Sequence, residues 1–366
     1  MKLQVSRNEL LQTLQSVVGV VERRQTLPVL SNFLLVVEDD SLTVTGTDLE
    51  MELVARARVQ NLAPGRITVP ARKLFDICRG LPEGAELTLE LQEDRLAVRS
   101  GRSRFSLATL RAEEFPAFSS SGGGRSVTVS RRELKSLIER TQFAMAQQDV
   151  RYYLNGLLLD VHPKRLRAVA TDGHRLAFSE LTRDTGVSES FQAILPRKSV
   201  QELARVLDAS DEEVVLQIAQ GQVQVDLDVV RLSTKTIDGR FPDYERVIPD
   251  NGDKQVLCDR ETLRRALART AILSNEKFRG VRLQLSNGEL KLQTHNPEHE
   301  EAEEEVEVEY QGAALEIGFN VNYLMDALAA LDAERVVMEL KNADSSGLLH
   351  AEGDRGSKYV IMPMRL

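Results

Sequence analysis

A short alternating segment followed by a capped amphipathic helix occurs three times in this 366-residue chain. In the first copy, Ser6 precedes the helix and Glu9 stands three residues later, which is the pattern of a capping box. Ser130 and Asp259 precede the equivalent helices of the later copies. A period of roughly 125 residues is the size of a typical domain, so the repeat predicts three similar domains.

Each repeat contains the same further elements. A second helix has apolar residues at i, i+3, i+4 and i+7, within residues 74–81, 200–207 and 324–331. Two alternating segments joined by turn residues follow each first helix, as in 33–37 with 42–45, and this is typical of antiparallel hairpins. We therefore expect an α+β fold made of three tandem copies of two helices on an antiparallel sheet.

The segments between the repeats set the expected domain boundaries. Glu114-Phe115-Pro116 and Arg240-Phe241-Pro242 follow the first and second repeats, and the first continues into a Ser- and Gly-rich stretch, 119–124. Such composition is typical of linkers. We expect a first domain over residues 1–125, a second over 126–253 and a third over 254–366.

The turn from Thr171 to Leu176 is the most suggestive place for catalysis, because Asp172 and His174 resemble an acid and base pair. A similar segment begins at Thr47, 124 residues upstream, and another at Thr294, 123 residues downstream, and neither keeps that pair. We interpret the turn as scaffold at a domain edge with an exposed Arg175. A hydrolase that uses Asp172 and His174 remains the alternative from another class.

Charge is distributed unevenly along the chain. The six expected helices together carry +7, which leaves −16 for the remainder of a chain whose total is −9. Basic helices suggest a surface that faces a polyanion, while the acidic remainder repels nonspecific nucleic acid. The alternative is that these Lys and Arg side chains simply face solvent. The acidic run Glu298 to Glu309 alternates with apolar residues toward its end, so we expect that end to form a strand.

Several classes of protein are excluded or disfavoured. The sequence has no run of 18 apolar residues, and its N-terminus alternates like a strand, so we expect a cytoplasmic, nucleoid-associated protein without a membrane partner. No nucleotide-binding glycine motif occurs. Cys78 and Cys258 are expected to be buried and unpaired, and His295 with His299 makes a poor metal site across Pro297. We expect no metal, no cofactor and no catalysis.

Over essentially its whole length the chain resembles the beta subunits of bacterial DNA polymerase III, the sliding clamps. The resemblance is carried by 46–51, 75–82, 148–156, 171–176, 238–244, 275–280 and 362–366. It implies a homodimer, joined head to tail into a six-domain ring around double-stranded DNA, that acts as the processivity factor of the replicative polymerase. Implied partners are the polymerase III alpha subunit, the clamp loader complex, and other polymerases and repair proteins that carry clamp-binding peptides. A monomeric repeat scaffold that never encircles DNA is a further alternative.

The resemblance also implies three sets of site residues. Those facing DNA are Arg24, Arg72, Lys73, Gln148, Arg151, Tyr152, Tyr153 and Arg197. Those lining a partner-peptide pocket are Leu154, Thr171, Gly173, His174, Arg175, Leu176, Pro242, Arg246, Val247, Phe278, Asn320, Tyr323, Val360, Met362, Pro363, Met364 and Arg365. Those closing the dimer are Arg102, Arg104, Phe105, Ile272, Leu273, Glu298, Glu300 and Glu303.

Two residues depart from the usual pattern of the family. His299 stands where Gln is frequent, so we expect the ion pairs at the dimer interface to be sensitive to pH. Asp344 stands where an apolar residue can border the peptide pocket, which leaves that edge of the pocket undefined.

Overall fold

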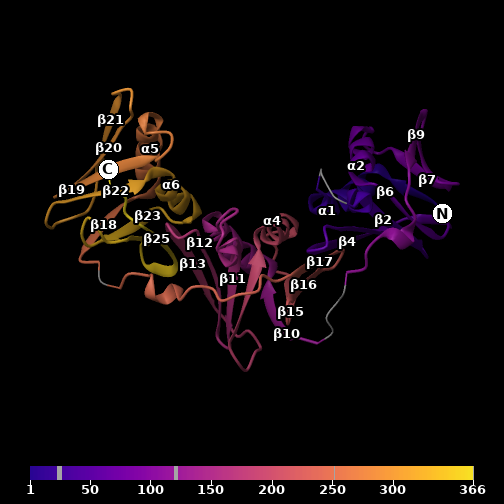
Figure 1. Ribbon diagram of the computed structural model, residues 1–366, viewed down its shortest axis with the longest axis horizontal. Helices are drawn as coiled ribbons and strands as arrows, with labels where there is room; N and C mark the ends of the chain where they lie inside the picture. Colours follow the sequence, from indigo (N-terminus) through magenta and orange to yellow (C-terminus); the bar gives the residue numbers. More distant parts are fainter. Residues whose placement is uncertain (23–26, 119–122, 251, 366) are drawn as a thin grey trace. The chain divides into compact units, whose positions relative to one another are not determined.

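The computed structural model describes residues 1–22, 27–118, 123–250 and 252–365. Within them all six expected helices are present (Figure 1). The side chains of Ser6, Asp259 and Asn320 act as N-caps: Ser6 accepts from the Glu9 N–H, Asp259 from that of Thr262, and Asn320 from that of Asn322. The helices are α1 (Arg7–Val17), α2 (Ala71–Gly80), α3 (Arg131–Glu139), α4 (Arg197–Val206), α5 (Arg260–Thr270) and α6 (Val321–Ala330).

The chain forms two compact units. The first unit comprises Met1–Arg132 and Gln201–Thr236, and the second comprises Glu133–Val200 and Ile237–Leu366. The second repeat therefore contributes strands to both units. Each unit contains one eight-stranded sheet and one smaller sheet, and every strand pair within these sheets is antiparallel, as the hairpin pattern predicted.

The strands follow one another across each sheet in a fixed order. In the first unit the smaller sheet is β5 (Gln60–Ala63), β1 (Lys2–Ser6), β7 (Glu86–Gln92), β8 (Arg95–Ser100) and β9 (Ser103–Ala108). Its larger sheet is β10 (Arg125–Ser130), β15 (Glu213–Ala219), β16 (Gln222–Leu227), β17 (Val230–Lys235), β4 (Met51–Arg58), β3 (Ser41–Thr47), β2 (Asn32–Glu38) and β6 (Gly65–Pro70).

The second unit is built in the same way. Its larger sheet is β14 (Phe191–Pro196), β11 (Gly156–His162), β12 (Arg165–Thr171), β13 (Arg175–Thr182), β25 (Asp354–Ile361), β24 (Gly347–Ala351), β23 (Arg335–Leu340) and β18 (Lys254–Asp259). Its smaller sheet is β21 (Glu301–Glu307), β20 (Glu289–His295), β19 (Gly280–Ser286) and β22 (Leu315–Asn320). The strand β21 confirms a strand in the acidic run, although this strand ends at Glu307, two residues before the run does.

Consecutive repeats are joined edge to edge inside the two larger sheets. In the first unit, β4 pairs with β17 and places Met51 opposite Thr234. In the second, β13 pairs with β25 and places Arg175 opposite Ile361. Met51 and Arg175 occupy equivalent positions, because the carbonyl oxygen of each accepts a hydrogen bond from the threonine hydroxyl that opens the preceding turn. The two junctions therefore share one strand register.

The strand register corrects the sequence alignment of the third repeat. Thr47 lies opposite Glu52 and Thr171 opposite Leu176, whereas the corresponding pair in the third repeat begins at His295, which lies opposite Glu301. The equivalent of Thr47 and Thr171 is thus His295, not Thr294. An alignment of the three threonines places Thr294 at this position instead. It is wrong because the third turn is one residue longer, and a turn can lengthen without changing its flanking strands.

Helices and sheets bury the predicted apolar stripes. Leu10 and Leu74 are fully buried where α1 packs on α2 and on β4, and Leu263 and Leu324 are fully buried where α5 packs on α6. Both cysteines are buried and unpaired, as predicted. Burial raises the pKa of Cys78 to about 11 and that of Cys258 to about 12, so both stay protonated thiols at neutral pH.

Candidate functional site

The turn from Thr171 to Arg175 is locked by its own side chains. The Thr171 hydroxyl accepts from the Gly173 N–H at 3.1 Å, and Asp172 Oδ1 accepts from the N–H groups of His174 and Arg175. Gly173 has φ +89°, a conformation that suits glycine. Because the Asp172 carboxylate is occupied in this way, it serves the turn rather than a proton-transfer pair with His174.

The first repeat builds the same turn from a different sequence. Thr47 Oγ1 accepts from the Leu49 N–H at 3.1 Å, and Asp48 Oδ1 accepts from the N–H groups of Glu50 and Met51. Leu49 takes φ +75° at the position of Gly173. The turn is therefore scaffold in both repeats, as its recurrence suggested, and what differs between them is the surface around it.

Arg175 is not exposed, contrary to the sequence interpretation. Its side chain is only 13% exposed to solvent. The guanidinium donates hydrogen bonds to Asp172 Oδ2, to Asp326 Oδ2 on α6 and to the Phe143 carbonyl oxygen. It also lies over the Tyr323 ring, 4.4 Å from the centroid. The only signal of this arrangement in the sequence is that Asp326 is the one acidic residue of its helix. Arg175 thus braces the junction of the second and third repeats.

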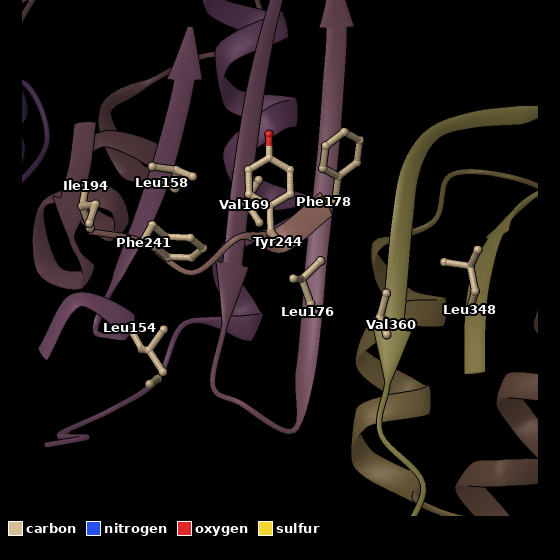
Figure 2. Packing of buried hydrophobic residues seen from close by; sticks show 11 residues of the cluster. Leu154, Leu158, Val169, Leu176, Phe178, Ile194, Phe241, Tyr244, Leu348 and Val360 are labelled. Atoms are coloured by element: carbon tan, nitrogen blue, oxygen red, sulfur yellow. The ribbon is translucent and has the colours of Figure 1, made fainter. Parts of the chain in front are cut away.

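A buried apolar cluster lies on the outer face of that junction, away from the helices (Figure 2). Leu154 and Leu176 come from the second repeat and Val360 from the third, and Figure 2 shows Leu176 and Val360 on the neighbouring strands β13 and β25. Exposed apolar side chains adjoin this cluster in the sequence, with Val247 43% and Met362 44% exposed. An apolar floor with an exposed apolar rim is the composition expected of a peptide-binding surface.

The other predicted pocket residues are exposed to different degrees. Gly173, His174 and Pro242 are exposed, and Thr171 and Pro363 are half-buried. Arg246 is exposed and pairs with Asp243 at 2.9 Å. The half-buried pair Asn320 and Tyr323 belongs to the start of α6.

Three further predicted residues line one groove. Phe278, Met364 and Arg365 line a groove of about 760 Å³ beside β21 and the turn that precedes it. The Met364 N–H is bonded to the Gly318 carbonyl oxygen at 2.8 Å, which holds the end of the chain against β22. Asp344 lies in the exposed turn before β24, where its N–H is bonded to Asn342.

The equivalent face of the first junction is polar. Strand registers make Leu158, Val169, Leu176 and Val360 equivalent to Leu34, Thr45, Glu52 and Ser233, in that order. Burial raises the pKa of Glu52 to about 7, with Arg231 opposing the shift. At these four positions the second junction is therefore apolar, whereas the first is polar at three of them.

Four predicted DNA-facing residues come together on one loop of the second unit. Gln148 and Tyr152 are exposed, and the Tyr152 and Tyr153 rings pack edge to face at 5.8 Å. Arg151 pairs with Asp149 at 2.8 Å and donates to the Asp172 carbonyl oxygen. Hydrogen bonds from Arg151 lower the pKa of Asp149 to about 2, so this pair stays charged at neutral pH.

The remaining predicted DNA-facing residues are tied to backbone or lie elsewhere. Arg197 donates to the Met145 carbonyl oxygen at 2.8 Å in the second unit. In the first unit, Arg72 donates to the Val21 carbonyl oxygen at 2.7 Å, and its neighbour Lys73 on α2 is exposed. Arg24 lies outside the described residues. The guanidiniums of Arg72 and Arg197 are thus held in place by neutral backbone acceptors.

The residues predicted to close a dimer lie on two sheet edges. Phe105 is exposed on β9, the edge of the five-stranded sheet, with Arg104 beside it and Arg102 in the preceding turn. The other set gathers around β21, the edge of the four-stranded sheet. It consists of Glu303 on β21, Glu298 and Glu300 in the turn before it, and Ile272 and Leu273 in a short helical turn that contacts β21. An unpaired edge is a template for pairing with another chain.

The described residues lack two features that belong to other classes of protein. Among them, no group of three or more His, Cys, Asp or Glu side chains is arranged to hold a metal ion. None of the helices they form combines the length and the apolar character needed to cross a lipid bilayer.

Comparison with known proteins gives one consistent result. Family models of the DNA polymerase III beta subunit match residues 1–119 (N-terminal domain), 128–243 (central domain) and 245–365 (C-terminal domain). The beta sliding clamp of Pseudomonas aeruginosa is 54% identical, and that of Escherichia coli K12 is 51% identical, each over 100% of both chains. A crystal structure of the P. aeruginosa sliding clamp bound to griselimycin superposes with a TM-score of 0.96 at 53% identity, again over 100% of both chains. The chain has the α+β clamp fold and belongs to the family of DNA polymerase III beta subunits, the sliding clamps.

Proposed function

We propose that two copies of this chain close head to tail into a ring that encircles double-stranded DNA and tethers the replicative polymerase to it. As a sliding clamp the protein is a non-catalytic processivity subunit. Its function therefore depends on binding and on encircling DNA, and not on a chemical step. The observation that carries the proposal is the identical register of the two internal junctions. It defines what a third junction, between β9 of one copy and β21 of another, would look like.

Applied to these edges, the shared register pairs the last strand of one repeat with the fourth strand of the repeat before it. Arg231 lies opposite Val54 in the first junction and Lys358 opposite Phe178 in the second. The equivalent third pair is Arg104 opposite Glu303 of the second copy. One residue further, Phe105 then lies opposite Ala302, on the helix-facing side. A contact of this kind between unlike edges closes a ring when the rotation allows it.

The interaction with DNA is proposed to be independent of sequence. The basic side chains at Arg72, Lys73, Arg151 and Arg197, with Arg24, would contact phosphates, and the exposed Gln148 and Tyr152, with Tyr153, would touch the backbone or stack on bases. Such contacts are weak and exchangeable, so the ring slides. Residence on DNA then depends on the ring staying closed.

Partner proteins are proposed to dock through a short peptide at the apolar cluster of the second junction. The floor is Leu154, Leu176 and Val360, and the rim includes Val247 and Met362. Proposed partners are the polymerase III alpha subunit, the clamp loader, and other polymerases and repair proteins. Griselimycin, which a P. aeruginosa clamp binds, is a suitable probe. Val247→Glu should weaken its binding at least about tenfold, since a charge on an apolar rim must be desolvated.

Two finer points belong to the same proposal. Residues 1–125, 126–253 and 254–366 are proposed as the three domains, and the matched ranges of the family models support that division. The proposed location is the cytoplasm, in association with the nucleoid.

Loading onto circular DNA tests the ring directly. Purified protein with a clamp loader and ATP is incubated with nicked circular DNA, separated from free protein by gel filtration, and the DNA is then cut once. A ring is retained on the circle and released by linearisation. Retention that ignores DNA topology would contradict the ring and favour a scaffold that binds from one side.

A further inference from the structure

The segment that joins the second repeat to the third, residues 237–248, lies against the outer face of the second repeat's sheet. We call it the linker segment. Its start is tied to β14 by a hydrogen bond of 2.8 Å from the Ile237 N–H to the Ile194 carbonyl oxygen. It carries Arg246 and Val247 of the predicted peptide pocket. The path of the linker segment over the sheet therefore decides where these two pocket residues lie.

One aromatic residue of the linker segment is buried among the residues of the pocket floor. Tyr244 belongs to the same apolar cluster as Val360, and its ring centroid lies 5.9 Å from that of Phe178 (Figure 2). The Val247 N–H donates to the Tyr244 carbonyl oxygen at 3.1 Å, which closes the short helical turn Tyr244–Arg246. The position of Val247 at the pocket rim is therefore set by the position of Tyr244.

Two charged side chains, which lie opposite each other on β11 and β12, hold the Tyr244 hydroxyl. The hydroxyl donates to Asp160 Oδ2 and accepts from Arg167 Nη1 at 2.9 Å, and both partners are buried. Burial, followed by the hydrogen bond to Asp160, raises the pKa of Tyr244, so the hydroxyl keeps the proton that it donates. We call these three residues the tyrosine anchor.

Further hydrogen bonds fix the two charged groups of the tyrosine anchor. Arg167 Nε donates to Glu180 Oε2 on β13 at 2.5 Å, and Arg167 Nη1 also donates to Glu245 Oε1 at 2.6 Å. Asp160 Oδ1 accepts from Gln192 Nε2 on β14 at 3.2 Å. Because strands of the sheet hold both charged groups, the hydroxyl that they bind fixes the linker segment to the sheet.

All three residues of the tyrosine anchor are different in the first repeat. Strand register places Val36 and Thr43 at the positions of the two charged residues. In the segment that follows the first repeat, Phe118 stands at the position of Tyr244, counted from the shared Phe-Pro pair. The carboxylate, the guanidinium and the hydroxyl thus occur together in the repeat that contributes to the apolar pocket floor, and they are replaced together in the other.

Hydrogen bonds to two fixed partners are directional, so they select one position of the Tyr244 ring where apolar packing alone allows several. We propose that Asp160 and Arg167 are positioning residues of the peptide pocket, a role that rests on the pocket proposed above. Through the Tyr244 hydroxyl they hold the linker segment where Val247 forms the rim. They act on a bound peptide only through this segment.

A triple variant tests this role without leaving a buried charge unpaired. Asp160→Val, Arg167→Thr and Tyr244→Phe together install the residues of the first repeat, and exchange of a buried ionic network for apolar groups is often neutral for stability. We expect a melting temperature within about 4 °C of that of the natural protein. The dissociation constant of griselimycin, measured by calorimetry, should rise about tenfold. Lys164→Thr, which breaks an exposed pair with Asp184, is the control and should leave binding unchanged.

Two further measurements separate positioning from a general loss of stability. Hydrogen exchange followed by mass spectrometry should be faster in the linker segment of the triple variant and unchanged in the four-stranded sheet of the same unit. Val247→Glu should weaken griselimycin binding much less in the triple variant than in the natural protein, because the rim residue is no longer held in place. If the triple variant does not fold, Tyr244→Phe alone should produce the same changes, since it removes only the hydroxyl.

The possible results separate the positioning role from the pocket itself. Griselimycin affinity or linker-segment exchange that stays the same in the folded variant would overturn the positioning role, even where Val247→Glu weakens binding to the natural protein. A Val247→Glu substitution with no effect on the natural protein would instead refute the pocket, and the positioning role with it.

Discussion

Arg175 Nη1 lies 2.5 Å from Asp326 Oδ2, and this ion pair joins the turn before β13 to helix α6. The two residues are 151 positions apart and belong to different repeats. The same guanidinium also holds Asp172 and the Phe143 carbonyl, so one side chain fixes the turn, helix α6 and the short 3-10 helix Gln142–Ala144. The stability of the second junction should therefore depend on it.

Arg175→Ala should lower the free energy of unfolding by about 1–3 kcal/mol. The change leaves Asp172 without its partly buried partner and removes the cation over Tyr323, while solvent around Asp326 limits the loss. Urea unfolding followed by circular dichroism measures this. Arg246→Ala breaks an ion pair whose arginine is exposed, and should change stability by less than about 0.5 kcal/mol. Equal effects of the two substitutions would argue against a bracing role.

Glu52 makes the first junction sensitive to pH. Burial raises its pKa to about 7, above the ordinary value of 4.5, so the folded state holds a proton that the unfolded chain releases. Stability from this group is complete below pH 4.5 and is lost as pH rises through 7. Glu52→Gln should remove that loss, and at pH 8 it should be more stable than the natural protein by about 1–2 kcal/mol after allowance for solvent screening.

Unfolding curves at pH 5 and pH 8 check the sign of this effect. Glu50→Gln is the control, since it breaks only the exposed pair with Lys235 and should show no such dependence on pH. A stability difference between Glu52→Gln and the natural protein that stays constant over this range would rule out proton uptake by Glu52.

Much of the fold could be predicted from the sequence, because its determinants are local. The caps at Ser6 and Asp259 and the apolar stripes set the helices to within a few residues. The junction partners could not be predicted, because the pairing of β4 with β17 depends on edges far apart in the chain. Alternation within a strand says which face is buried, not which strand lies beside it.

The site was predictable in part for the same reason. The resemblance to clamps supplied the pocket residues, but the sequence suggested an exposed Arg175, since its acceptors Asp326 and Phe143 are distant in the chain. Register was also needed to see that His295 replaces Thr294 as the counterpart of Thr171. The insertion of a residue in a turn does not change the alternation of apolar residues in the flanking strands. It is therefore detected only from the pairing of those strands.

Gly173→Ala should destabilise the turn by about 1–2 kcal/mol. Gly173 has φ +89°, and an added Cβ would lie 2.9 Å from the Arg151 guanidinium, so both backbone strain and crowding oppose the change. Gly80→Ala at the end of α2 is the control. An added Cβ there meets nothing within 4 Å, and the change should be neutral or slightly stabilising. Thermal unfolding compares the two, and an undiminished melting temperature for Gly173→Ala would contradict the strain.

The proposed ring closure predicts the behaviour of two charge reversals. Arg104→Glu and Glu303→Arg should each abolish the dimer, because the shared junction register places like charges opposite each other at both interfaces of the ring. Each change should raise the dimer dissociation constant about 100-fold or more, as measured by light scattering coupled to gel filtration. Glu305→Arg lies two residues from the predicted partner and should weaken the dimer much less.

Mixing the two variants then tests the register itself. In a heterodimer of Arg104→Glu with Glu303→Arg, one interface pairs the new glutamate with the new arginine, and the other keeps Arg104 opposite Glu303. Both interfaces are attractive, so an equimolar mixture of the two monomeric variants should form a dimer that neither forms alone. If the strands were shifted by two residues, Arg104→Glu would instead be rescued by Glu301→Arg or Glu305→Arg. A mixture that stays monomeric would show that β9 and β21 do not pair in the register of the two internal junctions.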